Sequence, residues 1–300
     1  MRSCVVAFAG VLFLAGCGSS SGRPTTHGAS GTLQSLAQTS GGYVALTPGD
    51  ADFAPGQVRF TFLVIAHDGR PVLKPTAAVD LTRGLKQRPF QHTTARLEEI
   101  GVPGVSDLPE GVPSIYVAQL RVPSPGTYWV LAKPRGARIA GLGSLAVRAH
   151  SYSPPVGAKA IASNTPTLAT SRGRLAPLTT AAHPDRALYT TSVAQALRAH
   201  EPFVLAFATP KFCTSRTCGP VVDVVSHVRR RFANENVRFI HVEVFADNNP
   251  SKGYNRWMRE WGLQSEPWVF VVGRDGRIKA KFEGSVSVRE LDAAARDVVG

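Results

Sequence analysis

Cysteine is scarce in this chain. Four occur in 300 residues, and two of them, Cys4 and Cys17, lie within the first seventeen positions. Cys213 and Cys218 are therefore the only thiol pair available to the folded part, which limits that part to a single intramolecular disulfide.

Acidic residues are also few, at 21 against 34 lysines and arginines, and the formal net charge is +13. No basic stripe with interleaved aromatics accompanies this excess, so we predict no nucleic-acid partner. The one dense cluster, Arg229–Arg231, ends an expected helix, where cations suit the helix dipole. We interpret the remaining surplus as a solvated basic surface near anionic envelope lipids.

Long apolar runs are absent apart from Cys4–Ala15, which is too short to span a bilayer. Arg2 precedes it as a charged n-region, and Leu14-Ala15-Gly16-Cys17 closes it. This ending resembles the bacterial lipobox. The resemblance implies a lipoprotein signal peptide over 1–16 and a lipid on Cys17. The alternative is an ordinary secretory leader with a chance cysteine.

Residues 17–42 follow as a flexible tether, because the stretch from Gly18 to Gly31 is rich in Ser, Gly and Thr. The leader places the rest of the protein on the extracytoplasmic face of a bacterial membrane, held in the cell envelope by its lipid. Whether that membrane is inner or outer stays open. Disulfides persist in such a compartment.

Residues 43–150 have the pattern of an all-β domain. Short apolar or alternating runs such as Gln57–Ala66 and Ile115–Val122 are separated by turn signals, with no helical period. We expect an immunoglobulin-like sandwich. The Pro- and Gly-rich stretch Val102–Pro113 is either a contact surface or a connector, and we favour the connector. Residues 151–186 lack periodicity and are expected to be a linker that runs into a strand of the second domain.

Residues 187–300 predict the order α-β-α-β-α-β-β-α. The first strand, Phe203–Ala208, is wholly apolar, and a helix with its apolar residues on one face follows the second thiol. Capping-box spacings at Ser192–Gln195 and Ser287–Glu290 start two other helices. The chain is thus expected to be multidomain, with the all-β sandwich followed by an α/β domain.

This order, with a thiol pair at the first strand-to-helix junction, resembles the thioredoxin family over Leu188–Gly300. The residues that carry the resemblance are Phe207, Cys213, Cys218-Gly219-Pro220, Glu266-Pro267-Trp268 and the hairpin at Gly276. The resemblance implies that Pro267 follows a cis peptide bond and that Glu266, before it, lines the disulfide. An ordinary proline at the start of a strand is the alternative.

The thiol spacing departs from that family, because four residues separate the cysteines instead of two. Positions five apart on one helix lie about 8.6 Å apart, whereas a disulfide needs less than about 7 Å. Cys213 should therefore lie in the loop ahead of the helix. Either it matches the family's attacking thiol, or Cys218-Gly219-Pro220 does and Cys213 resolves from upstream. Since helix N-terminal N–H groups favour a thiolate, we expect Cys218 to have the lower pKa.

Two carboxylates are candidate proton-transfer groups. Glu243 shares a strand face with His241 and would replace the buried acid that reductases of this family carry where Ala206 and Phe207 stand here. The sequence is equally compatible with His241 and Glu243 forming a hydrogen-bonded polar pair that has no catalytic role. Glu266 would oppose a nearby thiolate and make the pair more reducing.

These features predict a thiol–disulfide oxidoreductase that acts through Cys213 and Cys218 on extracytoplasmic protein thiols or disulfides, with no cofactor and no metal. One alternative is a non-catalytic thioredoxin-like scaffold in which the pair is a structural disulfide. Another is copper handling, for which the histidine expected late in the domain is missing after His241. The client and the direction of electron flow are left open.

Overall fold

The computed structural model describes residues 31–108 and 112–299. The expected signal peptide and the expected lipidation site, Cys17, lie outside these residues. Seven strands form the first sheet: β1 (Tyr43–Pro48), β2 (Gly56–Val64), β3 (Thr76–Thr82), β4 (Gln91–Glu99), β5 (Ser114–Val122), β6 (Gly126–Pro134) and β7 (Ala140–Val147). A second sheet holds β8 (Phe203–Phe207), β9 (Arg238–Val242), β10 (Trp268–Val272) and β11 (Ile278–Glu283).

The helices are α1 (Leu33–Gln38), α2 (Val193–Arg198), α3 (Cys218–Arg231), α4 (Arg256–Glu260) and α5 (Val288–Val299), with short 3-10 turns η1 (Arg186–Tyr189), η2 (Ala246–Asn248) and η3 (Pro250–Lys252). In the described part of the chain, none of these helices has the length and apolarity that crossing a bilayer requires.

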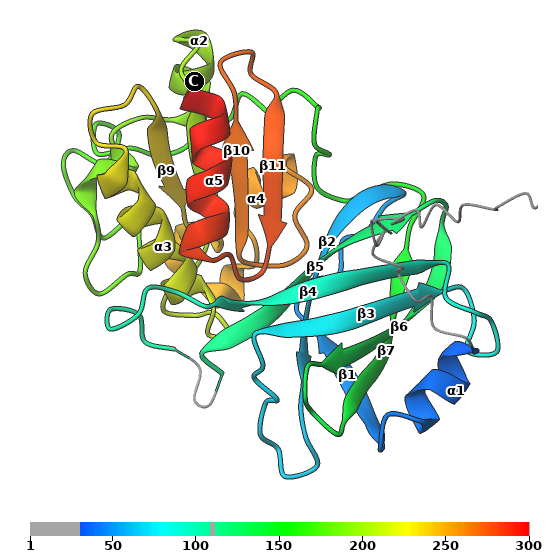
Figure 1. Ribbon diagram of the computed structural model, residues 1–300. Helices are drawn as coiled ribbons and strands as arrows, with labels where there is room; N and C mark the ends of the chain where they lie inside the picture. The colour runs from blue at the N-terminus through cyan, green and yellow to red at the C-terminus, as the bar shows by residue number, and fades with distance from the viewer. Residues whose placement is uncertain (1–30, 109–111, 300) are drawn as a thin grey trace, which may run out of the picture.

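The first sheet is a closed barrel in the order β1-β2-β5-β4-β3-β6-β7, and this corrects the expected two-sheet sandwich (Figure 1). A sandwich would leave an open edge on each sheet. Here β3 pairs with β4 over six residue pairs, and β1 pairs in parallel with β7. Every strand is therefore hydrogen-bonded to a neighbour on both sides, and the sheet has no free edge. Stacked aromatic rings of Phe60, Phe62 and Tyr116 fill the interior.

The end of the expected tether is ordered. Residues 33–38 form α1, which begins where the Thr32 hydroxyl accepts the N–H of Ser35. Leu33 and Ala37 are buried against Leu131 and Ala140 of the barrel. The flexible segment predicted for 17–42 therefore does not extend through this helix, because its two apolar residues have a surface to cover.

The second sheet has the order β11-β10-β8-β9, with β8 parallel to β9 and the other pairs antiparallel. From residue 187 onward, the helices and strands follow the order expected from the sequence. Helices α3 and α5 cover one face, and α2 and α4 contribute to the core on the other (Figure 1). Strand β8 is buried at all five positions, which explains why it contains only apolar residues.

Residues 151–185 contain no helix or strand, yet they are packed onto the second sheet and its helices. Leu178 is 2% exposed and belongs to the core under α3, with Leu168 and Leu175 beside it. The strand expected to follow this segment is instead η1, which Asp185 caps by accepting the N–H of Ala187. A polar side chain that binds the backbone two residues ahead favours a turn over a strand.

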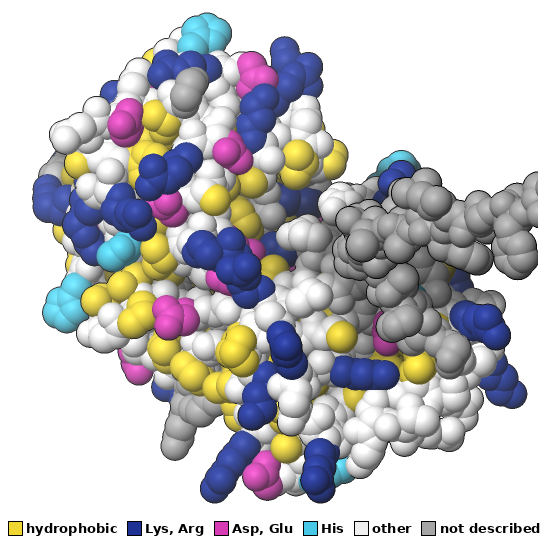
Figure 2. Space-filling view, in the orientation of Figure 1, with side chains coloured by type: hydrophobic (Ala, Val, Ile, Leu, Met, Phe, Trp, Pro, Cys, Tyr) yellow, Lys and Arg dark blue, Asp and Glu magenta, His cyan; other side chains and the backbone are white. Residues whose placement is uncertain are grey.

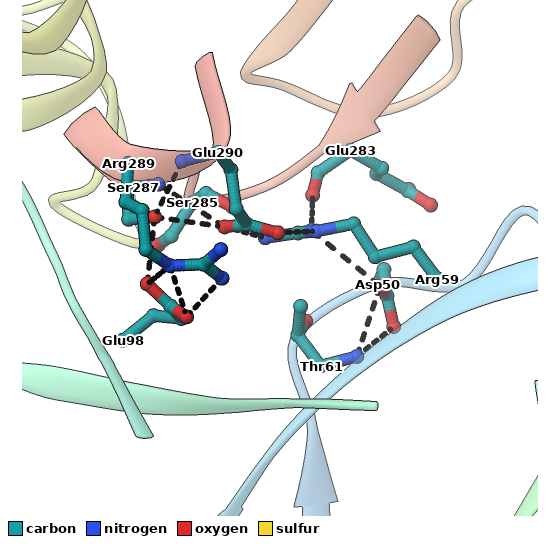
Figure 3. A network of polar contacts seen from close by, with 9 residues as sticks. All are labelled: Asp50, Arg59, Thr61, Glu98, Glu283, Ser285, Ser287, Arg289 and Glu290. Carbon is teal, nitrogen blue, oxygen red and sulfur yellow. Dashed lines mark hydrogen bonds and ion pairs between the residues drawn. The ribbon is translucent and has the colours of Figure 1, made fainter. Parts of the chain in front are cut away.

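The barrel is fixed to α5 by buried charges (Figure 3). Arg59 of β2 lies between Asp50 and Glu290, and it donates to both carboxylate oxygens of Glu290 at 2.8 and 3.1 Å. It also donates to the Ser285 carbonyl at 2.7 Å. Burial raises the pKa of Asp50 to about 8, although Arg59 acts to lower it.

The connection between β4 and β5 contacts α3, so the connector expected over Val102–Pro113 is in part a contact surface. Gly101 forms a bridge with Ser287, and Val102 is 6% exposed in the same core as Cys218. Burial raises the pKa of Asp223 on α3, and the nearby Ser106 side chain acts to lower it. Figure 2 shows lysines and arginines dispersed over the visible face of the molecule, with acidic side chains among them.

Candidate active site

The thiol pair lies where the chain leaves the carboxyl end of β8 and enters α3. Cys213 is in the loop and Cys218 is the first residue of the helix. Inside the loop, the N–H of Arg216 donates to the Cys213 carbonyl at 3.2 Å, and Arg216 has a φ of +58°. This left-handed residue turns the chain back over Cys213. As the spacing required, Cys213 lies ahead of the helix.

Cys213 is partly exposed and surrounded by hydrogen-bond donors. The backbone N–H of Cys218 donates to its sulfur at 3.3 Å, and the Ser215 hydroxyl lies 3.2 Å from it. That N–H belongs to the first turn of α3, where no intrahelical acceptor exists. A hydrogen bond from the Cys218 side chain, with further help from Ser215 and the backbone, lowers the pKa of Cys213 to about 5 despite some burial.

Cys218 is fully buried in the core formed by α3 and the sheet. Burial raises the pKa of its thiol far above the ordinary range, and the neighbouring Cys213 raises it further. The expectation that Cys218 is the lower-pKa thiol is therefore wrong. Its backbone N–H donates to the Cys213 sulfur, while its own sulfur is removed from solvent. The free-energy cost of desolvating a charge on that sulfur outweighs the stabilisation by the helix terminus. Both cysteines are free thiols in this structure.

The geometry favours the first of the two alignments considered for the motif. Cys213 takes the position of the exposed thiol, and Thr214–Thr217 form an enlarged segment between the cysteines. In the other alignment, Val221 would stand where the family has its second cysteine; it is 1% exposed in the core beneath α3.

The Glu266–Pro267 peptide bond is cis, as expected. Glu266 is half-buried, and Tyr254 donates to its carboxylate at 2.8 Å. Burial raises the pKa of Glu266, and the charge of Cys213 raises it further. The charge of Glu266 in turn contributes to the raised pKa of Cys218. Glu266 is thus electrostatically coupled to both sulfurs.

Glu243 has different surroundings from those expected. It is 4% exposed, and one carboxylate oxygen accepts the N–H of Thr180 at 2.5 Å and its hydroxyl at 2.7 Å. It lines a cavity of about 260 Å³ whose wall also includes Pro166, Arg174 and Leu178. The 151–186 segment thus binds only one of the two carboxylate oxygens, because Oε2 is buried without a hydrogen-bond partner among the described residues. A role of Glu243 in proton transfer stays a prediction.

His241 is tied into the same buried layer. Its Nδ1 is 2.7 Å from the Tyr189 hydroxyl, and its Nε2 is 3.0 Å from the Ala208 carbonyl. A carbonyl only accepts, so Nε2 carries the proton and the Tyr189 hydroxyl donates to Nδ1. Burial lowers the pKa of His241, which keeps the ring neutral.

Three residues of the site were not singled out from the sequence: Ser215, Thr217 and Tyr254. The first two were visible as hydroxyl residues in the enlarged segment between the thiols, a signal that spacing arguments did not use. Across residues 31–108 and 112–299, the structure holds no cluster of three or more His, Cys, Asp or Glu side chains suited to a metal ion.

No protein-family model matches this chain, and no curated protein does either. Among solved structures, the chain is similar to a thiol:disulfide interchange protein of the thioredoxin family from Chlorobium tepidum TLS. The two are 17% identical, with a TM-score of 0.30, over 37% of this chain and 86% of the other.

Proposed function

We propose that this protein is a thioredoxin-like thiol–disulfide oxidoreductase that exchanges disulfides with client proteins through Cys213 and Cys218. The observation that supports it is the asymmetry of the pair: Cys213 is partly exposed with a pKa of about 5, and Cys218 is a buried thiol whose backbone N–H donates to the Cys213 sulfur. In disulfide exchange, an exposed thiolate attacks the client disulfide, and a second, protonated thiol later resolves the mixed disulfide. The two cysteines have the properties that these two roles require.

In the reducing direction, the Cys213 thiolate attacks a client disulfide, and a client thiolate leaves as the mixed disulfide forms. Cys218 loses its proton and attacks the Cys213 sulfur, which releases the second client thiolate and leaves a Cys213–Cys218 disulfide. Glu266, coupled to both sulfurs, is the group we propose for receiving the Cys218 proton. Two electrons pass to the client, and the steps run equally in reverse.

The test is a trapped intermediate. In a Cys218→Ala variant the mixed disulfide on Cys213 has no resolving thiol, so client proteins should remain covalently attached and be released by a reducing agent. Cys213→Ser is the matched control and should trap nothing. If Cys218→Ala traps no client and the wild type shows no insulin reduction or dithiol oxidation, the pair is a structural staple and the protein a non-catalytic module.

The place of action is a further part of the proposal. The lipobox-like sequence ending at Cys17 supports a lipid anchor and an extracytoplasmic position, with clients among envelope proteins. Mass spectrometry of the mature N-terminus tests it. An unlipidated chain that begins at another residue would contradict the anchor and leave the exchange chemistry untouched.

A further inference from the structure

Two of the four residues between the cysteines, Ser215 and Thr217, form a chain of hydroxyl groups that ends on the Cys213 sulfur. The Ser215 Oγ lies 3.2 Å from the Cys213 Sγ and 2.8 Å from the Thr217 Oγ1. A thiolate has no proton to give, so Ser215 is the donor to sulfur. The Thr217 hydroxyl then donates to Ser215, which strengthens the donor through cooperativity.

We propose that Ser215 is a thiolate-stabilising residue and that it makes the Cys213–Cys218 disulfide a donor of disulfides to reduced protein dithiols. This inference rests on the proposed exchange function and assigns its direction. It depends on Ser215 and Thr217, which lie in the four-residue segment that sets this chain apart from a two-residue spacing.

The argument compares the two redox states of the pair. In the reduced state, the Cys213 thiolate accepts hydrogen bonds from the Ser215 hydroxyl and the Cys218 N–H. In the disulfide the same sulfur is neutral and is a weak acceptor. Hydrogen bonds to a charged group are the strong ones. They favour the reduced state, and a couple whose reduced form is stabilised is the stronger oxidant.

One group acts in the opposite sense. Glu266 carries a negative charge that repels the Cys213 thiolate. Burial is the larger cause of the raised pKa of Glu266, and the charge of Cys213 raises that pKa further. It is itself held by the Tyr254 hydroxyl, which reduces its effect on the sulfur. The donors to Cys213 act at contact distance, whereas Glu266 acts through space. The hydrogen-bond donors lower the pKa of Cys213 to about 5 against the opposing effect of burial.

Access to the sulfurs fits the same direction. Cys218 is 0% exposed, so an incoming client thiolate reaches the disulfide at Cys213. That attack forms a mixed disulfide on Cys213 and displaces Cys218, which takes up a proton in its buried site. The second client thiolate then attacks the client sulfur, and Cys213 leaves as a thiolate. A low-pKa thiol is a good leaving group, so this last step is fast.

The balance of this reaction is complete. The client dithiol loses two electrons and two protons and gains a disulfide. The pair gains the two electrons, one proton remains on Cys218, and the other passes to solvent because Cys213 stays ionised. The oxidant is the Cys213–Cys218 disulfide itself, supplied as the oxidised protein.

The experiment uses three variants of the full chain. Ser215→Ala removes the donor, Ser215→Thr keeps a hydroxyl at the position, and Thr214→Ala changes an exposed neighbour in the same segment. The pKa of Cys213 is measured from thiolate ultraviolet absorbance against pH. The redox equilibrium of the pair is measured in glutathione buffers of set ratio.

Ser215→Ala should raise the pKa of Cys213 by about one unit, since a hydrogen bond to a charged group contributes about that much. The equilibrium with glutathione should move about tenfold toward the protein disulfide, which is about 30 mV for a two-electron couple. Ser215→Thr should restore most of both values, and Thr214→Ala should match the wild type.

An unchanged pKa and equilibrium in Ser215→Ala would overturn the inference, as would a wild-type pair that stays oxidised in excess reduced glutathione. Either result is compatible with a trapped client in Cys218→Ala, which would leave the proposed function standing. Absence of any trapped client, with no exchange activity in the wild type, would remove both.

Discussion

Arg59 of β2 donates hydrogen bonds to both carboxylate oxygens of Glu290, which lies in the first turn of α5. The two side chains are only 10% and 9% exposed. Although burial acts to raise it, the pKa of Glu290 is lowered by Arg59 and by hydrogen bonds from Ser287. The barrel thus supplies a cation to a carboxylate that also caps the last helix of the α/β part.

Removing one partner of this pair should destabilise the whole chain. We expect Arg59→Met to lower the free energy of unfolding by about 3 kcal/mol, because Glu290 is left buried without its counter-charge. Chemical denaturation measures the loss. The double variant Arg59→Met with Glu290→Gln should cost less than the two single changes added together, and strict additivity would contradict the coupling.

Alkylation of Cys213 should follow a thiolate that is formed well below neutral pH. Because its pKa is lowered to about 5, its rate with iodoacetamide should rise through pH 5 and be level by pH 7. Cys218 should stay unmodified in the folded protein, since its sulfur is buried. Mass spectrometry of labelled peptides separates the two sites. A rate that rises only near pH 9 would contradict this prediction.

The same ionisation should make the stability of the reduced protein depend on pH. The pKa of Cys213 is lower in the folded chain than its ordinary value of 9, so the stabilisation is complete above pH 9. It is lost progressively as pH falls toward 5, and is absent below that. Relative to Cys213→Ser, the reduced wild type should gain about 1 to 2 kcal/mol at pH 7, allowing for solvent screening. Thermal unfolding of both proteins from pH 4 to pH 9 checks the trend, and a constant difference would refute it.

Neutralising Glu266 should make the pair more oxidising. Without the carboxylate, the Cys213 thiolate loses an opposing charge, and the reduced state gains stability. We expect Glu266→Gln to raise the redox potential by about 10 to 20 mV. Glu201→Gln, which removes a carboxylate paired with Arg238 beside the opposite end of β8, is the matched control. An unchanged or lower potential in Glu266→Gln would defeat the hypothesis.

Local chemistry made much of the α/β part predictable. The two capping boxes form as expected: Ser192 with Gln195, and Ser287 with Glu290. The wholly apolar run at β8 and the apolar residues on one face of α3 also predicted correctly which positions are buried. Such signals depend on residues a few positions apart, which is why a single sequence carries them.

The errors concern features set by distant parts of the chain. Closure of the barrel depends on which strands pair, and alternation within a strand does not specify its partner. The order of the two thiol pKa values was reversed because burial of Cys218 is a property of the packed core, whereas helix position is local. The contact of Glu243 with Thr180, far away in the sequence, was likewise not foreseen, and its role in proton transfer stays a prediction.

Leu168, Leu175 and Leu178 all precede residue 187, where the sequence pattern placed the start of the second domain. A recombinant fragment cut at that position would leave unfilled volume beside α3, exposing valines that the full chain shields from water. Its poor solubility would then be misread as a defect of the redox motif. Fragments intended for biophysical work should retain the polypeptide from residue 151 onward, so that these three leucines stay in place.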